Sequence, residues 1–319
     1  MKNEEGVETK YGTLQGITNV EYYSDGGIKE CTTNEKLILK TDYGNLIPQY
    51  ENEGVRRRFI KTLAFYPNGI LKKIALEEQT VIETSIGSLS AELIHFYENG
   101  KIKRVFPLNG KITGYWTEDN EFELAKNIKF ELDFGIYELK AMNILFYKSG
   151  NIKSITFWPK EFFTINIPIG KIGVRYGLGL YESGKIRSFE PAYPVVVETP
   201  IGKITAFDMN ANGVNGDINS LNLYEDGSIC SLVTSTDVII VTNVKGEEMI
   251  FKPEYSAGML GEEELEMLPL HIQFQGDYIC FHNKKENKYS IRTYKITVIN
   301  NGFDLVKKCG SCENCQGCI

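Results

Sequence analysis

The sequence predicts an all-β protein, a repetitive antiparallel meander of hairpins, and three observations lead to this prediction. One turn motif recurs six times, a second kind of turn alternates with it, and helical periodicity is confined to Glu118–Lys126 and Glu262–Leu268. The first motif usually reads aromatic, two polar residues, Gly, a variable residue and an aliphatic residue. Its copies are Tyr23–Ile28, Tyr66–Leu71, Tyr97–Ile102, Tyr147–Ile152, Tyr181–Ile186 and Tyr224–Ile229.

Each copy of this motif has the composition of a hairpin turn. An Asn-Gly, Asp-Gly or Ser-Gly pair supplies a residue that tolerates positive φ, and β-rich segments flank the turn on both sides. The tyrosine ends one strand and the aliphatic residue begins the next. The six tyrosines are 43, 31, 50, 34 and 43 residues apart. We therefore expect related units that carry loop insertions of different lengths.

A second turn, Thr-x-aliphatic-Gly-x-aliphatic, lies between successive copies of the first. It is clearest in Thr84–Leu89 and Thr199–Ile204, and looser copies are Tyr43–Leu46, Phe134–Ile136 and Ile167–Ile172. Turns that alternate at opposite ends of successive strands produce an up-and-down meander. Two turns per unit suffice for two or three strands, which favours an elongated sheet or solenoid. A propeller with four-stranded blades is the alternative.

Two copies of the first motif with their flanks, Phe96–Lys103 and Leu180–Ile186, resemble the bacterial variant of the MORN repeat. The resemblance holds at the level of the motif over residues 10–250. It implies an array of meandering β-hairpins and a binding or scaffolding role, in some members as antitoxin-like proteins.

The chain is expected to have a MORN-like hairpin array over residues 1–250, a β-rich cap over 251–308 and a cysteine-rich tail over 309–319. A cap is expected because an open array leaves an unpaired strand edge that is prone to association. Its core would be the strands Tyr278–His282 and Tyr289–Ile299, joined by a turn over Asn283–Lys288.

Composition and charge exclude several classes of protein. Of the 319 residues, 42% are hydrophobic and 24% are charged, which is typical of a folded chain and excludes global disorder. The 35 basic and 42 acidic residues give a net charge of −7. This balance disfavours a general nucleic-acid binder and electrostatic attachment to anionic lipid, so we expect the partner to be another protein. The basic runs Arg56–Arg58 and Lys284–Lys285 are expected to be solvated loop charges.

The N-terminal residues Met1–Gly6 precede no apolar stretch, and no window approaches the ~18 apolar residues needed to span a bilayer. We therefore expect a cytoplasmic protein with no signal peptide and no membrane span. The glycines are spread one per hairpin rather than gathered in a phosphate-binding motif. These observations favour a non-enzymatic protein.

Four of the seven cysteines stand in the last eleven residues, as Cys309, Cys312, Cys315 and Cys318. Their C-x2-C-x2-C-x2-C spacing lets neighbouring thiolates reach one ion. Three cysteines at this spacing resemble the ligand run of bacterial-type ferredoxins, but the fourth comes one position early and lacks the following proline. We expect an iron–sulfur cluster or zinc, and Cu(I) is also compatible with thiolates. Reversible thiol–disulfide chemistry and an unligated tail are the alternatives.

The remaining cysteines and the histidines are expected to be structural. Cys31, Cys230 and Cys280 lie in apolar strand contexts, where cysteine is usually a small core residue. His95 stands in a predicted strand beside Phe96, and we expect it to pack there rather than to act in catalysis.

The insertion Asp208–Asn219 begins with D-x-N-x-N-G, the opening of a calcium loop. Asp208, Asn210 and Asn212 would supply side-chain oxygens at alternate positions. Asn219 stands where a bidentate glutamate is expected, and Asp217 could supply a carboxylate instead. Calcium binding is the hypothesis, and an ordered Asn/Gly-rich loop is the alternative that we favour.

The segment Leu108–Asp119 combines Lys111, the aromatic pair Tyr115–Trp116 and the acids Glu118 and Asp119. Such a set could line a pocket. The alternative, which we favour, is that the aromatic pair packs on the sheet and the acids begin a short helix.

The sequence thus favours a binding scaffold with an extended β surface and a metal- or cluster-binding tail. A redox or metal-delivery accessory protein that acts on a partner enzyme is the second hypothesis. The third is an enzyme that uses the 108–119 and 208–219 loops.

Overall fold

The computed structural model describes residues 6–300, except 53, 60, 214, 215, 259, 260 and 283–285. Strands make up 57% of the structure and helix 3%, so the all-β prediction is confirmed. The chain forms two compact units. Unit 1 contains the described residues of 1–166, 174–189 and 212–219, and unit 2 contains those of 167–173, 190–211 and 220–300. No helix within this described part is long and apolar enough to cross a bilayer.

The elements of unit 1 are fourteen short or medium strands and one helix. They are β1 (Val7–Thr9), β2 (Gly12–Leu14), β3 (Ile17–Tyr22), β4 (Ile28–Thr33), β5 (Leu39–Thr41), β6 (Gly44–Leu46), β7 (Leu63–Phe65), β8 (Leu71–Thr84), β9 (Gly87–Phe96), β10 (Ile102–Phe106), α1 (Glu118–Leu124), β11 (Ile128–Leu132), β12 (Gly135–Leu139), β13 (Ala141–Phe146) and β14 (Ile152–Phe157).

Three further strands contribute residues to both units, and unit 2 holds the rest. The three are β15 (Phe163–Ile167), β16 (Gly170–Leu180) and β17 (Ile186–Pro191). Unit 2 has β18 (Val195–Thr199), β19 (Gly202–Ala206), β20 (Leu221–Leu223), β21 (Ile229–Thr234), β22 (Val238–Thr242), β23 (Glu248–Phe251), β24 (Glu254–Gly258), β25 (Gly261–Leu268), β26 (Leu270–Gln275), β27 (Tyr278–His282), β28 (Glu286–Ser290) and β29 (Lys295–Ile299).

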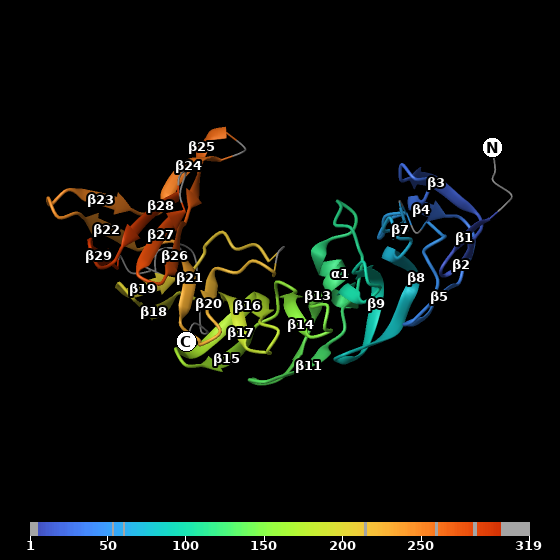
Figure 1. Ribbon diagram of the computed structural model, residues 1–319, viewed down its shortest axis with the longest axis horizontal. Helices are drawn as coiled ribbons and strands as arrows, with labels where there is room; N and C mark the ends of the chain where they lie inside the picture. The colour runs from blue at the N-terminus through green and yellow to red at the C-terminus, as the bar shows by residue number, and fades with distance from the viewer. Residues whose placement is uncertain are drawn as a thin grey trace, which may run out of the picture. The chain divides into compact units, whose positions relative to one another are not determined.

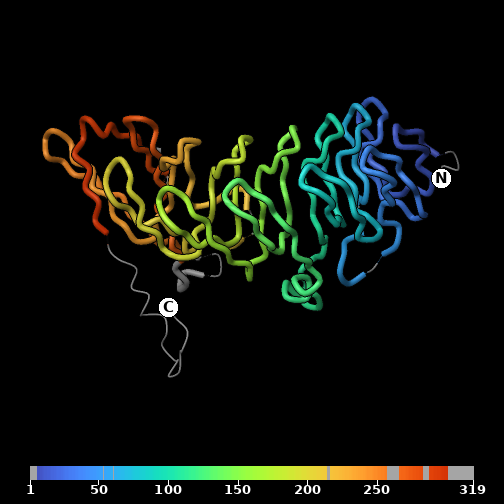
Figure 2. Tube along the Cα trace, turned by 90° about the horizontal axis from the view of Figure 1, so that it is seen from below, coloured from blue at the N-terminus to red at the C-terminus, as the bar shows by residue number. Residues whose placement is uncertain are grey.

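Unit 1 is organised around one continuous antiparallel sheet (Figure 1). Its strand order is β17-β16-β14-β13-β10-β9-β8-β7-β4-β3, and β15 pairs with β16. Three hairpins, β1–β2, β5–β6 and β11–β12, are separate two-stranded sheets. Figure 2 shows successive hairpins of this unit side by side.

A single cross-strand row of side chains forms the centre of the unit 1 core. Each member is directly opposite the next on the neighbouring strand, and all of them are fully buried. The row is Cys31, Leu63, Ile74, Ile94, Val105, Ile144, Ile155 and Leu178. Because side chains alternate between the two faces of a strand, this row defines the core face of the sheet and leaves an opposite, non-core face.

The six copies of the first motif form the same turn. In each copy the tyrosine amide donates to the carbonyl four residues later at 2.7–2.8 Å, and the glycine amide donates to the tyrosine carbonyl at 2.9–3.0 Å. The six glycines have φ between 75° and 102°. Glycine is required here because side chains clash with the backbone at positive φ. The hairpin prediction at these six places is therefore confirmed.

The tyrosine hydroxyls join successive hairpins of unit 1. Each donates to the carbonyl of the residue just before the next motif's tyrosine, at 2.7–2.9 Å. The pairs are Tyr23 with Phe65, Tyr66 with Phe96, Tyr97 with Phe146 and Tyr147 with Leu180. In unit 2 the hydroxyl of Tyr224 donates to the carbonyl of Phe274. We call this series the tyrosine ladder.

The second turn is held by its threonine. The hydroxyl of Thr84 donates to the carbonyl of Gly87 at 2.8 Å, and Thr199, Thr41 and Thr9 make the same bond three residues along. The copy that begins at Thr9 was not recognised in the sequence. In the copies at Thr9 and Thr41 the following tyrosines, two residues on, accept hydrogen bonds from the amides of Leu71 and Ile102.

Unit 2 has a sheet of order β20-β21-β26-β27-β28, a three-stranded sheet β23-β22-β29 and the hairpins β18–β19 and β24–β25. Two predictions are wrong here. Residues 262–268 belong to strand β25, which pairs with β24, rather than to a helix. The expected strand Tyr289–Ile299 is divided by a turn at residues 291–294. The part before the turn, β28, pairs with β27, and the part after it, β29, pairs with β22. The boundary expected at residue 250 stays a prediction.

We expect Tyr97→Phe to lower the free energy of unfolding by about 1 kcal/mol, because it leaves the carbonyl of Phe146 without its donor. Urea unfolding would measure the loss. Tyr115→Phe is the matched control, since the Tyr115 side chain is 90% exposed. Equal stability of the two variants would contradict the structural role of the ladder.

Candidate functional site

A β-bulge lies at the same place in the first-motif hairpins. In five of the six hairpins, those of Tyr23, Tyr66, Tyr97, Tyr147 and Tyr224, the pairing skips one residue, and that residue is the sixth after the motif tyrosine. The skipped residues are Lys29, Lys72, Lys103, Lys153 and, in unit 2, Cys230. A bulge inserts one extra residue opposite a single partner residue, and it therefore changes which face the following side chains occupy.

The bulge makes each of these strands present two successive side chains on the non-core face. On β10, Ile102 and Val105 are both buried in the core, although they are three positions apart in the sequence. In a regular strand they would lie on opposite faces. Lys103 and Arg104, between them, are exposed and half-buried respectively. The same pattern of burial holds for β4 and β8, whereas on β14 Lys153 is half-buried and Ser154 is buried.

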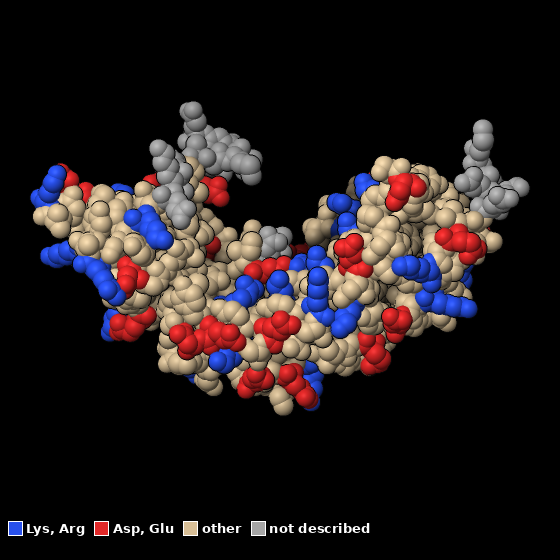
Figure 3. Space-filling model, viewed as in Figure 1, with Lys and Arg blue, Asp and Glu red and all other residues tan. Residues whose placement is uncertain are grey.

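The first outward position is basic in every hairpin of unit 1. Arg187 stands six residues after Tyr181, and its guanidinium lies beside Gly179 on β16. We call Lys29, Lys72, Lys103, Lys153 and Arg187 the bulge row. Figure 3 shows Lys and Arg side chains gathered over the middle strands of unit 1, with acidic side chains around them.

Three lysines of the bulge row lie over the ring of their own motif tyrosine. The ammonium groups of Lys72, Lys103 and Lys153 are 5.6, 5.7 and 5.4 Å from the ring centroids of Tyr66, Tyr97 and Tyr147. A cation over an aromatic face is attracted by its quadrupole. The ladder tyrosines therefore also orient the lysines, and within the described residues these three lysines have no ion pair.

His95 lies between two pairs of neighbouring basic residues, Lys72–Lys73 on β8 and Lys103–Arg104 on β10. It is directly opposite Lys73 on β8 and Arg104 on β10, and its ring packs edge-on against Phe106 at 5.3 Å. Burial and, in decreasing order, the charges of Lys73, Arg104, Lys103 and Lys72 together lower the pKa of His95 to about 4. Four cations thus converge on this part of the face. The expected structural placement of His95 in a strand is what the structure shows.

Residues 216–219 cover the next part of the same face. Asp217 binds the guanidinium of Arg104 and the hydroxyl of Ser154. Asn219 donates to the hydroxyl of Ser188 at 2.9 Å. Gly177 leaves the space for this loop, because a Cβ there would lie 2.6 Å from the Cα of Gly216. The loop therefore covers the second outward residues of β14 and β17.

The residues of the calcium hypothesis have other partners. Asp217 is engaged by Arg104 and Ser154, and Asp208 accepts a hydrogen bond from the amide of Asn210 at 2.8 Å. The side chain of Asn210 donates to the carbonyl of Met267, and Asn212 is exposed. Among the described residues, no three His, Cys, Asp or Glu side chains are grouped to hold a metal ion. The calcium site stays a prediction.

The basic run Arg56–Arg58 is not a set of solvated charges, and this expectation is wrong for its first two members. Arg56 makes two hydrogen bonds to each of Glu92 and Glu121, at 2.8–2.9 Å. Arg57 is 2% exposed and donates to the carbonyls of Leu76 and Glu77. The run instead fastens its loop to the sheet.

The 108–119 segment joins the same network. Trp116 donates its indole N–H to Glu121 at 2.6 Å, and α1 begins at Glu118 with Thr117 as its capping residue. The short helix is confirmed, but Tyr115 is 90% exposed and does not pack on the sheet. Trp116 and Asp217, from the two loops considered for an enzyme, belong to separate hydrogen-bond networks.

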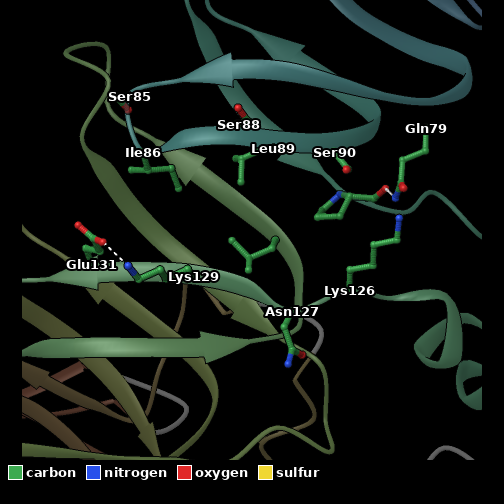
Figure 4. Close-up of a pocket in the computed structure, with 12 residues that line it drawn as sticks. Gln79, Ser85, Ile86, Ser88, Leu89, Ser90, Lys126, Asn127, Lys129 and Glu131 are labelled. Carbon is green, nitrogen blue, oxygen red and sulfur yellow. Dashed lines mark hydrogen bonds and ion pairs between the residues drawn. The ribbon is translucent and has the colours of Figure 1, made fainter.

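A groove of about 520 Å³ lies between the β8–β9 turn and strand β11 (Figure 4). Ile86 and Leu89 give it apolar walls, and Ser88, Ser90 and Lys126 stand at its rim. The groove exists because β9 extends beyond β10, which ends before Pro107. Proline has no amide hydrogen and cannot continue the ladder along β9.

The cysteine tail, Cys309, Cys312, Cys315 and Cys318, lies outside the described residues. Cys31 and Cys280 are fully buried, as expected, and burial raises the pKa of the Cys31 thiol to about 12. Cys230 is half-buried at its bulge rather than in the core.

The bulge row was missed in the sequence, although a signal for it is present. A basic residue follows each of the first five motif tyrosines by six positions. No family model, curated protein or solved structure matches the chain, so the comparisons with known proteins assign no function to this surface.

We expect wild-type protein to lose stability relative to His95→Gln as the pH falls from 6.5 to 4. The unfolded chain, with a histidine pKa near 6.5, takes up the proton before the folded chain, whose pKa is about 4. Protonation therefore favours unfolding in this window, by roughly 3 kcal/mol at its lower end. Denaturant unfolding at several pH values would measure the difference. Parallel profiles for the two proteins would contradict it.

Proposed function

We propose that this chain is a non-enzymatic binding scaffold, built as a MORN-like array of hairpins, whose non-core sheet face in unit 1 contacts another protein. The observation that carries the proposal is the bulge at the same place in successive hairpins. A sheet needs no bulge to bury its core residues. The bulges instead add an outward side chain per hairpin, and this gives a regular surface on the face opposite the core.

The arrangement of the polar groups supports the same function. Arg56 donates hydrogen bonds to both Glu92 and Glu121, and these bonds hold its loop in place. Lys72, Lys103 and Lys153 of the bulge row have no carboxylate partner in the described part of the chain, whereas Lys29 is paired with Glu21. Exposed cations held at regular places on a rigid sheet suit recognition of another molecule.

A bulky, uncharged substitution on this face tests the scaffold. Leu93→Trp changes a half-buried non-core residue beside Phe106, and Ile136→Trp changes a residue of β12 that is 66% exposed. We expect proteins that co-purify with the tagged wild-type chain to be lost with Leu93→Trp and retained with Ile136→Trp. Identical sets of proteins from both folded variants would contradict the proposal.

The cysteine tail is proposed to hold zinc or an iron–sulfur cluster, which would also suit the alternative of a redox or metal-delivery accessory protein. The support is the C-x2-C-x2-C-x2-C spacing of four thiolate ligands. Lys307 and Lys308 would offset part of their negative charge.

We expect anaerobically purified full-length protein to contain metal, and a chain that ends at Lys308 to contain none. Elemental analysis, sulfide content and the visible spectrum would measure this difference. Cys230→Ser is the matched control and should keep the metal, because Cys230 lies in a bulge of unit 2. Equal metal content in the full-length and shortened chains would exclude the tail as the site.

A further inference from the structure

We propose that the bulge row binds an extended acidic segment of a partner protein, with one carboxylate facing each cation. This inference rests on the proposed scaffold function and adds the chemistry of its ligand. It is carried by the spacing of the cations, the absence of ion pairs to Lys72, Lys103 and Lys153 within the described residues, and the shape of the sheet.

The spacing of the row matches an extended polypeptide. The strands that carry the bulge row, β4, β8, β10, β14 and β17, are every second strand of the sheet, so consecutive cations are about 10 Å apart. A polyproline II chain rises about 3.1 Å per residue and has three residues per turn, so every third side chain lies on one face and about the same distance apart. A segment that crosses the strands would meet one cation with every third side chain.

Charge is concentrated in the middle of the row. The second outward residues of β8 and β10, Lys73 and Arg104, are also basic. β8 therefore presents an adjacent pair of cations, whereas on β10 Asp217 offsets the charge of Arg104. At one end, Lys29 is partly neutralised by Glu21 at 3.4 Å. At the other, the loop with Asp217 covers the second outward residues. Lys72, Lys103 and Lys153 are consequently the cations most available to an acidic ligand.

A flexible acidic chain fits this surface better than a nucleic acid. Neighbouring strands rotate by about 20–25°, so a row across them curves, and a stiff duplex would meet few of its cations. Single-stranded nucleic acids rely on exposed aromatic platforms for stacking. Here the rings of Tyr66, Tyr97 and Tyr147 lie beneath lysine ammonium groups. The net charge of −7 also opposes a long polyanion beyond the row.

The test uses a fluorescent peptide of about thirteen residues with glutamate at every third position. A peptide of the same composition with its glutamates in one block is the spacing control. We expect the spaced peptide to bind more tightly, and its affinity to fall as salt is raised. Equal binding of the two peptides, or no binding of either, would overturn the proposal.

Charge variants locate the site. The triple variant Lys72→Gln, Lys103→Gln, Lys153→Gln should weaken binding roughly tenfold, since each exposed ion pair contributes modestly. The matched control Lys10→Gln, Lys40→Gln, Lys126→Gln removes three exposed lysines of unit 1 that lie outside the row. Equal loss in both would overturn the proposal. So would a single-stranded oligothymidine of equal charge that binds more tightly than the spaced peptide.

His95 gives a readout that needs no variant. It lies between Lys73 and Arg104, so carboxylates bound there would favour the imidazolium and raise its pKa. NMR titration of His95 with and without the spaced peptide would show the rise, and an unchanged pKa under saturating peptide would overturn the proposed position. Failure of these tests while Leu93→Trp still removes partners would reject the acidic ligand and leave the scaffold function standing.

Discussion

The hydrogen bond from each motif tyrosine to the next hairpin is the interaction on which the rest of unit 1 depends. It joins two turns directly, so the turns stay in step whether 31 or 50 residues separate them. The acceptor is always the carbonyl at the end of the preceding strand. The glycine at positive φ makes the turn tight enough for the tyrosine to reach it. Position along the sheet is thus set by the turns, and the loops between them are free to vary.

The bulge connects this framework to the surface. It follows each turn at a fixed distance, so the register that places an isoleucine or leucine in the core also places two residues outside. The lysine of the bulge lies over the tyrosine that fixes the turn. One side chain therefore has its ring beneath a surface cation and its hydroxyl on the neighbouring hairpin. Framework and surface are specified by the same six or seven residues of sequence.

Much of the fold could be predicted because its signals are local. The Tyr-x-x-Gly motif and the Thr-x-x-Gly turn identified the hairpins, and the acids Glu118 and Asp119 identified the start of the helix. The errors arose where distant partners decide the structure. Arg56 is half-buried and ion-paired because Glu92 and Glu121 reach it from other elements, and residues 262–268 form a strand because β24 pairs with them. The bulge row was missed because alternation was assumed to run unbroken through each strand.

The independence of the turns from the length of the loops makes the chain open to insertion. The segment between β10 and β11 contains a helix, whose Glu121 binds Arg56. The hydroxyls of Tyr97 and Tyr147, on either side of this segment, nevertheless make the same bonds as the other motif tyrosines. New sequence can enter at such a point without a change in the sheet. A duplicated motif would add one hydrogen bond to the tyrosine ladder and one cation to the surface. If the face binds the proposed acidic segment, the number of motifs would set the length of the segment that it can bind.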